Sequence, residues 1–299
     1  MTRLGSIKAA LLAFCMMCVT SVSSAVTVND SQGEFTIDTT PKRIVVLEFS
    51  FADALAAVDV SPVGIADDND PERVLSDVRE IIGTWQSVGT RSQPSLEVIA
   101  SLKPDLIIAD ISRHAGVYED LKKIAPTLIL PSRRETYADN LKAASIIGKV
   151  VGKEAQMQAR LAKHETLMDQ FKHSLPEGEQ VQFAVAREKS LFLHTEDSYA
   201  GGVLTRLGMQ VPEFNRDDSA SREVSLEQML TVNPNYLIVG KYTSPNVLDS
   251  WAQEPLWQMT KAVQQKHLYF VNANVWARCR GILAAERMAQ DLIDVLAQP

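Results

Sequence analysis

Several side chains that could bind an anion follow the ends of expected β-strands in this 299-residue chain. In open α/β sheets, ligands bind beyond the carboxyl ends of the strands, where helix N-termini and loop amides favour negative charge. These positions hold two acids, one histidine, two aromatic residues and five arginines: Glu48, Asp67, His114, Tyr242, Trp276, Arg91, Arg113, Arg187, Arg278 and Arg280. The surplus of arginine predicts a cleft that binds a carboxylate-rich anion.

Arginine suits carboxylates because its guanidinium group can form two parallel hydrogen bonds in a fixed plane, which lysine cannot. Arg113, Arg278 and Arg280 stand just before or at the start of predicted helices, where a cation opposes the helix dipole. A bound polyanion would reverse the sign of that interaction. The alternative is that each arginine only makes a local ion pair at the surface. For Tyr242 and Trp276 the alternatives are an aromatic wall of the cleft and ordinary core packing.

Two glutamates recur at equivalent places in the two halves of the chain. Ser95-Leu96-Glu97 and Ser225-Leu226-Glu227 open two copies of one pattern, offset by 130 residues, in which a short helix leads through a proline-containing turn into a buried strand. Each glutamate follows a serine that could cap its helix, so a purely structural role is one interpretation. The other is that two exposed carboxylates, one in each half, dock a symmetric partner that carries two arginine pockets.

Other kinds of site have little support in the sequence. There is no G-x-S-x-G nucleophile elbow and no Walker or dinucleotide glycine pattern. The five histidines are scattered, with no H-x-H or H-E-x-x-H pair, so we expect no metal site built on imidazoles and no catalytic residue. A hydrolase that uses Glu48, Asp67 and His114 remains the alternative from a different class.

Strands and helices alternate along both halves of the chain. In the first half, strands are predicted at 43–49, 63–66, 105–109 and 127–130, and helices at 51–58, 71–82, 115–124 and 137–151. In the second, strands are predicted at 181–186, 191–193 and 267–271, and helices at 202–207, at 247–265 with a break at Pro255, and at 282–296. Strands that are apolar throughout and alternate with helices indicate a parallel sheet covered on both faces.

A long amphipathic helix is predicted between the halves, at Glu154–His173. It has no helix breaker inside, and Met157, Leu161 and Met168 share one face of it. At about 1.5 Å per residue it would span roughly 30 Å, the width of a small domain. We therefore divide the chain into a leader (1–25), an α/β lobe (26–152), an interlobe helix (153–175) and a second α/β lobe (176–299), with the ligand in the cleft between the lobes.

The first 25 residues are typical of a cleaved signal peptide. Arg3 and Lys8 precede the apolar run 9–19, and the small residues 23–25 suit a signal peptidase. Removal of two positive charges and no negative ones changes the net charge from −7 to −9, which argues against nucleic acid as a partner. Because the apolar run is too short to span a bilayer, we expect no membrane insertion. Because the mature chain keeps one cysteine, Cys279, we expect no disulfide.

Six stretches of the mature chain also match a known family: RIVVLEFSFADALAAVDV, GIADDND, SVGTRSQPSLEVIASLKPDLIIAD, SRHAGVYEDL, EPLWQM and NVWARCRGILAAERMA. On these stretches the chain resembles the periplasmic iron-siderophore binding proteins of ABC importers. The element SLEVIASLKPDLI is specific to that superfamily, whereas SRHAG and WARCRG narrow the resemblance to the branch that carries iron(III) dicitrate.

The resemblance implies a class III periplasmic binding protein, which is an α/β fold of two Rossmann-like lobes joined by one long interdomain helix. It implies a monomer without a cofactor in the periplasm of a Gram-negative bacterium, which binds ferric citrate and delivers it to an inner-membrane ABC permease dimer. Glu97 and Glu227 match the glutamates that dock on permease arginines. Arg91, Arg113, Arg278 and Arg280 sit in motifs that line the ligand cleft, and Arg187 matches more loosely. Another ferric siderophore, or haem held by Tyr242 or a histidine, is the alternative ligand.

Overall fold

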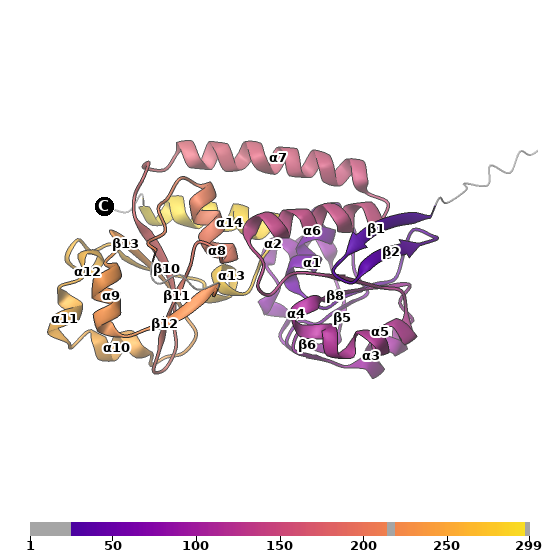
Figure 1. Ribbon diagram of the computed structural model, residues 1–299, viewed down its shortest axis with the longest axis horizontal. Helices are drawn as coiled ribbons and strands as arrows, with labels where there is room; N and C mark the ends of the chain where they lie inside the picture. The colour runs from indigo at the N-terminus through magenta and orange to yellow at the C-terminus, as the bar shows by residue number, and fades with distance from the viewer. Residues whose placement is uncertain (1–24, 214–218, 297–299) are drawn as a thin grey trace, which may run out of the picture.

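Two α/β lobes lie side by side and one long helix spans them both (Figure 1). The computed structural model describes residues 25–213 and 219–296. The predicted leader, 1–25, therefore lies outside the described residues except for Ala25. Within the described part of the chain, every helix is too short or too polar to cross a membrane.

The sheet of the first lobe has five parallel strands in the order β5-β4-β3-β8-β9. Side chains alternate between its faces, so Ile107 packs on α3 and α5 whereas Ile108 packs on α1 and α6. The predicted parallel sheet with two covered faces is confirmed. The bounds are Ile44–Val46 (β3), Gly64–Ile65 (β4), Gln86–Ser87 (β5), Leu106–Asp110 (β8), Thr127–Leu130 (β9), Phe49–Ala56 (α1), Leu96–Ser101 (α3), Tyr118–Ile124 (α5) and Tyr137–Val150 (α6).

Two helices of the first lobe differ from the prediction. The expected helix at 71–82 is divided into the 3-10 turn Pro71–Arg73 (η1) and Ser76–Ile82 (α2), because Val74 and Leu75 leave the helical path to bury their side chains in the core. The helix expected at 115–124 begins as the 3-10 turn Ala115–Val117 (η2) and continues as α5, and the short helix Ile111–His114 (α4) precedes it. Two short hairpins complete the lobe: Val26–Asp30 (β1) with Gly33–Ile37 (β2), and Gly89–Thr90 (β6) with Gln93–Pro94 (β7).

The sheet of the second lobe is mixed, in the order β12-β11-β10-β13-β14. Strands β10, β12, β13 and β14 of this sheet run in one direction, whereas β11 runs antiparallel to its neighbours β10 and β12. The link of 187–190 between β10 and β11 is too short for a crossover between parallel strands. The strand bounds are Val181–Ala186 (β10), Leu191–His194 (β11), Ser221–Val224 (β12), Tyr236–Lys241 (β13) and Leu268–Val271 (β14).

Helices cover both faces of this second sheet. The stretch expected as one broken helix at 247–265 forms three short helices, α10, α11 and α12, which pack with α9 on one face. Helices α8 and α14 cover the other face. The bounds are Tyr199–Arg206 (α8), Leu226–Val232 (α9), Val247–Trp251 (α10), Pro255–Gln258 (α11), Lys261–Gln264 (α12), Ala273–Ala277 (α13) and Ile282–Leu296 (α14).

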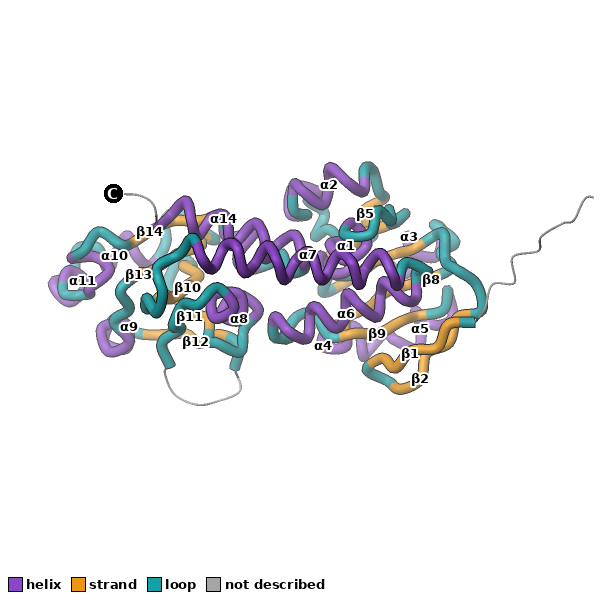
Figure 2. The backbone as a smooth tube through the Cα atoms, turned by 90° about the horizontal axis from the view of Figure 1, so that it is seen from above, coloured by secondary structure: helices purple, strands orange, loops and turns teal. Residues whose placement is uncertain are grey.

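The interlobe helix α7 has the bounds that the sequence predicts, Glu154–His173. Gly152 precedes it with φ 69°, a left-handed conformation that favours glycine and separates α7 from α6. Met157 packs into the core of the first lobe and Met168 into that of the second. The buried residues of α7 therefore join it to both lobes, and Figure 2 shows α7 from above as it crosses from one lobe to the other.

The lobes also share a direct contact at the start of α14. Cys279, Ile282 and Ala284 belong to the second half of the chain but pack in the core of the first lobe. Asp53 of α1 accepts hydrogen bonds from the backbone N–H groups of Leu283 and Ala284, at 3.1 and 3.0 Å, and so caps α14 from the opposite lobe. Burial raises the pKa of this carboxyl to about 7, even though backbone hydrogen bonds oppose the shift.

Candidate functional site

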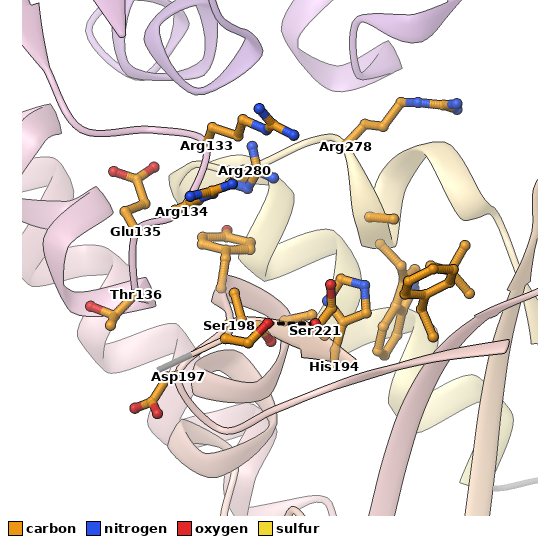
Figure 3. A pocket seen from close by; sticks show the side chains of 18 of the residues that line it. Arg133, Arg134, Glu135, Thr136, His194, Asp197, Ser198, Ser221, Arg278 and Arg280 are labelled. Carbon is orange, nitrogen blue, oxygen red and sulfur yellow. Dashed lines mark hydrogen bonds between the residues drawn. The ribbon is translucent and has the colours of Figure 1, made fainter. Parts of the chain in front are cut away.

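A cavity of about 920 Å³ lies between the lobes, in the size range of small-molecule sites. Both lobes line it. The first lobe contributes Arg91, Arg113 and the loop 133–136, and the second contributes residues after β10, β11, β13 and α13. Figure 3 shows Arg133, Arg134, Arg278 and Arg280 on one side of the cavity, with His194, Ser198 and Ser221 across from them.

All seven residues predicted to line a cleft do line this cavity. They are Arg91, Arg113, Arg187, Tyr242, Trp276, Arg278 and Arg280. They come from five separate segments of the chain, so the fold brings together residues up to 189 positions apart, from Arg91 to Arg280. Their environments differ, however, and the difference separates structural arginines from those free to meet a ligand.

Arg91 and Arg113 are ion-paired and hold the first-lobe wall together. Arg91, in the turn between β6 and β7, donates to Asp68 from Nε at 3.2 Å and from a terminal nitrogen at 2.8 Å. Arg113 Nε lies 2.5 Å from the carboxylate of Glu48, which is fully buried and also lies 3.6 Å from Arg91. For these two arginines, the local ion pair that the sequence left open is therefore present.

The pKa values of the paired acids reflect the same contacts. Burial raises the pKa of Glu48, while the charges of Arg113 and Arg91 oppose the rise. Burial alone would also raise the pKa of Asp68, but hydrogen bonds from Arg91 outweigh it and bring the value to about 2. The guanidinium of Arg91 further stacks over the ring of Phe49, 4.0 Å from its centroid. This side of the cavity is a fixed platform.

Five arginines of the cavity have no carboxylate within ion-pair distance in the described chain. Arg187 lies over the rings of Phe192 and Tyr242, with its guanidinium carbon 4.7 and 5.8 Å from their centroids. Arg278 also lies over the ring of Tyr242, with its guanidinium carbon 4.1 Å from the ring centroid. Burial, and then repulsion from Arg113 and Arg134, lowers the pKa of Arg133. The five unpaired residues are Arg133, Arg134, Arg187, Arg278 and Arg280.

Sequence reasoning missed Arg133 and Arg134. They follow the carboxyl end of β9 in the segment Ser132-Arg133-Arg134-Glu135, so the strand-end rule that selected the other arginines would have selected them as well. A buried carboxylate positions this loop. Asp110, at the end of β8, accepts hydrogen bonds from the backbone N–H groups of Ser132 and Arg133 at 2.8 and 3.1 Å.

The two aromatic residues predicted for the cleft, Trp276 and Tyr242, have different roles. Trp276 is 1% exposed, packs 5.3 Å from the ring of Phe183 and donates from Nε1 to Asp291 at 2.9 Å. It is a core residue at the floor of the cavity, whereas Tyr242 is half-buried and forms an aromatic wall beneath two guanidinium groups. His194 also lines the cavity; burial, with a smaller contribution from Arg280, lowers its pKa to about 3, so it is neutral.

Glu48, Asp67 and His114, the set considered for a hydrolase, are engaged in contacts within the first lobe. None of Glu48, Asp67 and His114 lines the cavity. Asp67 accepts from Trp85 Nε1 at 3.0 Å and from Ser87 Oγ at 2.5 Å. His114 accepts from the backbone N–H of Asp110 through Nδ1 at 2.9 Å, so its Nε2–H donates to the carbonyl of Arg91 at 2.7 Å. Over the described residues there is also no cluster of three His, Cys, Asp or Glu side chains that could hold a metal.

Glu97 and Glu227 lie on opposite lobes, each the second residue of a short helix and exposed. Figure 1 places both helices, α3 and α9, on the side of the molecule away from α7. Ser95 and Ser225 cap these helices by accepting from the N–H of Val98 and Gln228 at 3.3 Å. The hydroxyl of Ser225 also donates to Glu227 at 2.7 Å and lowers the pKa of that carboxyl. The caps are thus made by the serines, which leaves both carboxylates at the surface.

This chain is similar in sequence and in fold to known proteins. It is 54% identical, over 94% of this chain and 93% of the relative, to the Fe(3+) dicitrate-binding periplasmic protein FecB of Escherichia coli (strain K12). It is 41% identical to the Fe(3+)-citrate-binding protein YfmC of Bacillus subtilis (strain 168), over 89% of this chain and 84% of that one. The structure of Staphylococcus aureus SirA complexed with staphyloferrin B superposes with a TM-score of 0.79 at 23% identity, covering 91% of this chain and 98% of that chain.

The structural likeness confirms the predicted class of fold, in which two α/β lobes are joined by one long helix. The family described as "Periplasmic binding protein" matches residues 44–275, a range that includes both sheets and the whole of α7. Both sequence alignments cover most of the relative's own length as well as most of this chain. The chain therefore belongs to the periplasmic binding protein family.

Proposed function

We propose that this protein captures ferric dicitrate in the periplasm and delivers it to an inner-membrane ABC iron importer. The observation that carries the proposal is the set of five unpaired arginines that converge from both lobes on one cavity. Unpaired cations held close together repel one another: the pKa of Arg133 is lowered by burial first and then by repulsion from Arg113 and Arg134. A compact ligand rich in carboxylates would relieve that repulsion and accept charge-assisted hydrogen bonds.

The arrangement favours a ligand that is enclosed rather than chemically changed. Arg133 and Arg134 lie on the first lobe and Arg187, Arg278 and Arg280 on the second, so a polyanion would contact both lobes at once. The seven lining arginines include Arg91 and Arg113, whose pairing with buried acids keeps the platform rigid. The names of the two sequence relatives, both ferric citrate binders, support the same ligand.

Delivery to a permease rests on Glu97 and Glu227. Both are exposed, both stand at the start of a capped helix, and they occupy equivalent places on the two lobes. A dimeric permease with one arginine pocket per subunit would meet one glutamate from each lobe. We propose that the mature protein, after loss of residues 1–25, acts as a monomer in this exchange.

A thermal melt of the mature protein tests the ligand. The samples contain ferric citrate, iron-free citrate, a hydroxamate siderophore or no addition. A ligand that binds only the folded state stabilises it by about 2.7 kcal/mol at a hundredfold excess over its dissociation constant, which raises the midpoint by a few degrees. We expect this rise with ferric citrate. A rise with the hydroxamate instead, or a visible absorbance change with haem, would keep the importer role and reject the dicitrate assignment.

A further inference from the structure

Glu135 is a buried carboxyl group at the edge of the arginine cavity, and no arginine pairs with it. It lies in the loop between β9 and α6, lines the cavity and is only 4% exposed. Its Oε1 accepts a hydrogen bond from Nδ2 of Asn140 at 2.9 Å, whereas its Oε2 is buried without a partner. Figure 3 shows it beside Arg133 and Arg134 on the first-lobe wall.

The absence of an ion pair is informative in this setting. Paired acids elsewhere in the wall, such as Glu48 with Arg113, contact guanidinium groups directly. In the described chain, by contrast, no cationic nitrogen lies within ion-pair distance of Glu135, and its one hydrogen bond comes from a neutral amide. An ionised carboxylate in that position would lack compensation for the loss of water around it.

The charges that face Glu135 come from three surrounding elements. Arg280, which precedes α14, favours the ionised form, whereas Asp110 at the end of β8 and Glu48 at the start of α1 disfavour it. Burial is the largest influence, and it raises the pKa of Glu135 to about 9. At neutral pH the group therefore carries a proton, so its free oxygen is a hydrogen-bond donor rather than an acceptor.

We propose that Glu135 is a specificity-determining residue whose carboxyl group, as a neutral acid, turns toward the cavity and donates a hydrogen bond to a carboxylate oxygen of the bound polycarboxylate. This inference rests on the proposed function and specifies how the site reads its ligand. A neutral donor adds a contact for an anion without cancelling any of the five unpaired arginine charges. An ionised glutamate at the same place would repel the ligand and neutralise one arginine.

If the carboxyl proton of Glu135 has only a structural role, the variants should behave differently. Oδ1 of Asn140 is also buried without a partner, so the proton of Glu135 could serve an internal acid–amide pair instead of the ligand. In that case removal of the side chain would lower the stability of the free protein and leave ligand affinity unchanged. The two roles are separated by measuring the melting temperature and the dissociation constant on the same variants.

The test compares Glu135→Gln and Glu135→Ala with wild type by titration calorimetry with ferric citrate at pH 7. We expect Glu135→Gln to bind within about threefold of wild type, because its amide N–H still donates, and Glu135→Ala to bind about tenfold or more weakly. Glu154→Gln is the control, since it neutralises an exposed acid outside the cavity. We expect this control to bind ferric citrate as wild type does.

The pH profile supplies a second readout. As pH rises from 7 to 9.5, wild type should lose affinity relative to Glu135→Gln, since only wild type ionises; the ratio of the two constants cancels changes in the ligand itself. Equal losses in the Gln and Ala variants, or an Ala variant with normal affinity and reduced stability, would overturn the inference alone. Wild-type protein that fails to bind ferric citrate would overturn the proposed function and this inference with it.

Discussion

The carboxylate of Glu286 on α14 accepts two hydrogen bonds of 2.8 Å from the guanidinium of Arg160 on α7. One oxygen of Glu286 also lies 2.7 Å from Nδ1 of His164, whose Nε2 lies 2.5 Å from the hydroxyl of Tyr137 at the start of α6. None of these four side chains lines the arginine cavity. The network therefore ties the interlobe helix to both lobes without taking part in ligand contact.

Loss of the Glu286 charge should destabilise the protein without changing its affinity. Burial alone would raise the pKa of Glu286, but hydrogen bonds from His164 and Arg160 lower it, so its stabilisation is present at neutral pH and is lost as the pH falls through the folded-state value. We expect Glu286→Gln to lower the free energy of unfolding at pH 7 by about 1 to 3 kcal/mol, measured with urea. Asp169→Asn on α7, which removes an exposed partner of Arg206 on α8, should lower the free energy of unfolding by less than about 1 kcal/mol. Equal costs for both variants would contradict this role.

Asp53 should make stability depend on pH in the opposite sense. Its folded pKa of about 7 lies above the ordinary value of 3.8, so its favourable contribution is complete below pH 3.8 and is lost as the pH rises through 7. Asp53→Asn cannot ionise, and the gap in unfolding free energy between wild type and this variant should therefore narrow from pH 5 to pH 8. Urea denaturation at both pH values measures the gap. Glu119→Gln, at an exposed site, should show a constant gap, and the same constancy in Asp53→Asn would reject the effect.

Replacement of a paired arginine of the cavity should mainly lower stability, whereas replacement of an unpaired arginine should mainly weaken ligand binding. Arg113→Ala leaves the fully buried Glu48 with only the more distant Arg91, so we expect a loss of about 3 to 5 kcal/mol in unfolding free energy. Arg133→Ala breaks no ion pair and should leave stability within about 0.5 kcal/mol while weakening ferric citrate binding. Melting temperature and calorimetric affinity, measured on both variants, separate the two classes. A stability loss in Arg133→Ala as large as that in Arg113→Ala would show that the division is wrong.

Much of this fold could be predicted because local signals and tertiary packing agree. The bounds of α7 follow from Gly152 before it, Pro176 after it and an apolar stripe between them. The parallel sheet of the first lobe follows from strands that are apolar on both faces. The antiparallel edge of the second sheet could not be derived in this way, because strand direction depends on pairing and the half-exposed β12 has no apolar run to mark it.

The candidate site was predictable in composition but not in pairing. Strand ends located five of its arginines, and the same rule covers Arg133 and Arg134. Which guanidinium groups are free depends on where Glu48 and Asp68 lie in space. Glu48 is 65 positions from its partner Arg113 in the sequence, and Asp68 is 23 positions from its partner Arg91. The protonated state of Glu135 likewise arises from burial by distant segments, which no local pattern encodes.

Arg278 should be sensitive even to replacement by lysine. Its guanidinium carbon lies 4.1 Å from the centroid of the ring of Tyr242, over which Arg187 also lies, and all three residues line the cavity. We expect Arg278→Ala to weaken ferric citrate binding by about 1 to 3 kcal/mol, and Arg278→Lys to recover only part of the loss, because an ammonium group cannot form two parallel bonds to a carboxylate. Tyr242→Phe keeps the ring and should bind nearly normally. Full recovery by lysine would mean that Arg278 acts only through its charge.

The two surface glutamates should separate transport from binding. Glu97 and Glu227 lie outside the cavity on opposite lobes, so the double change to Ala should leave the affinity for ferric citrate within about twofold of wild type. Uptake of radioactive iron by cells that depend on this protein should nevertheless fall about tenfold or more, because each lobe loses the carboxylate that would meet a permease arginine. Glu80→Ala with Glu223→Ala is a matched control, since it also removes one exposed glutamate from each lobe. Normal uptake in the Glu97 and Glu227 variant would remove the docking role, and a loss of ligand affinity would place these residues in the binding site instead.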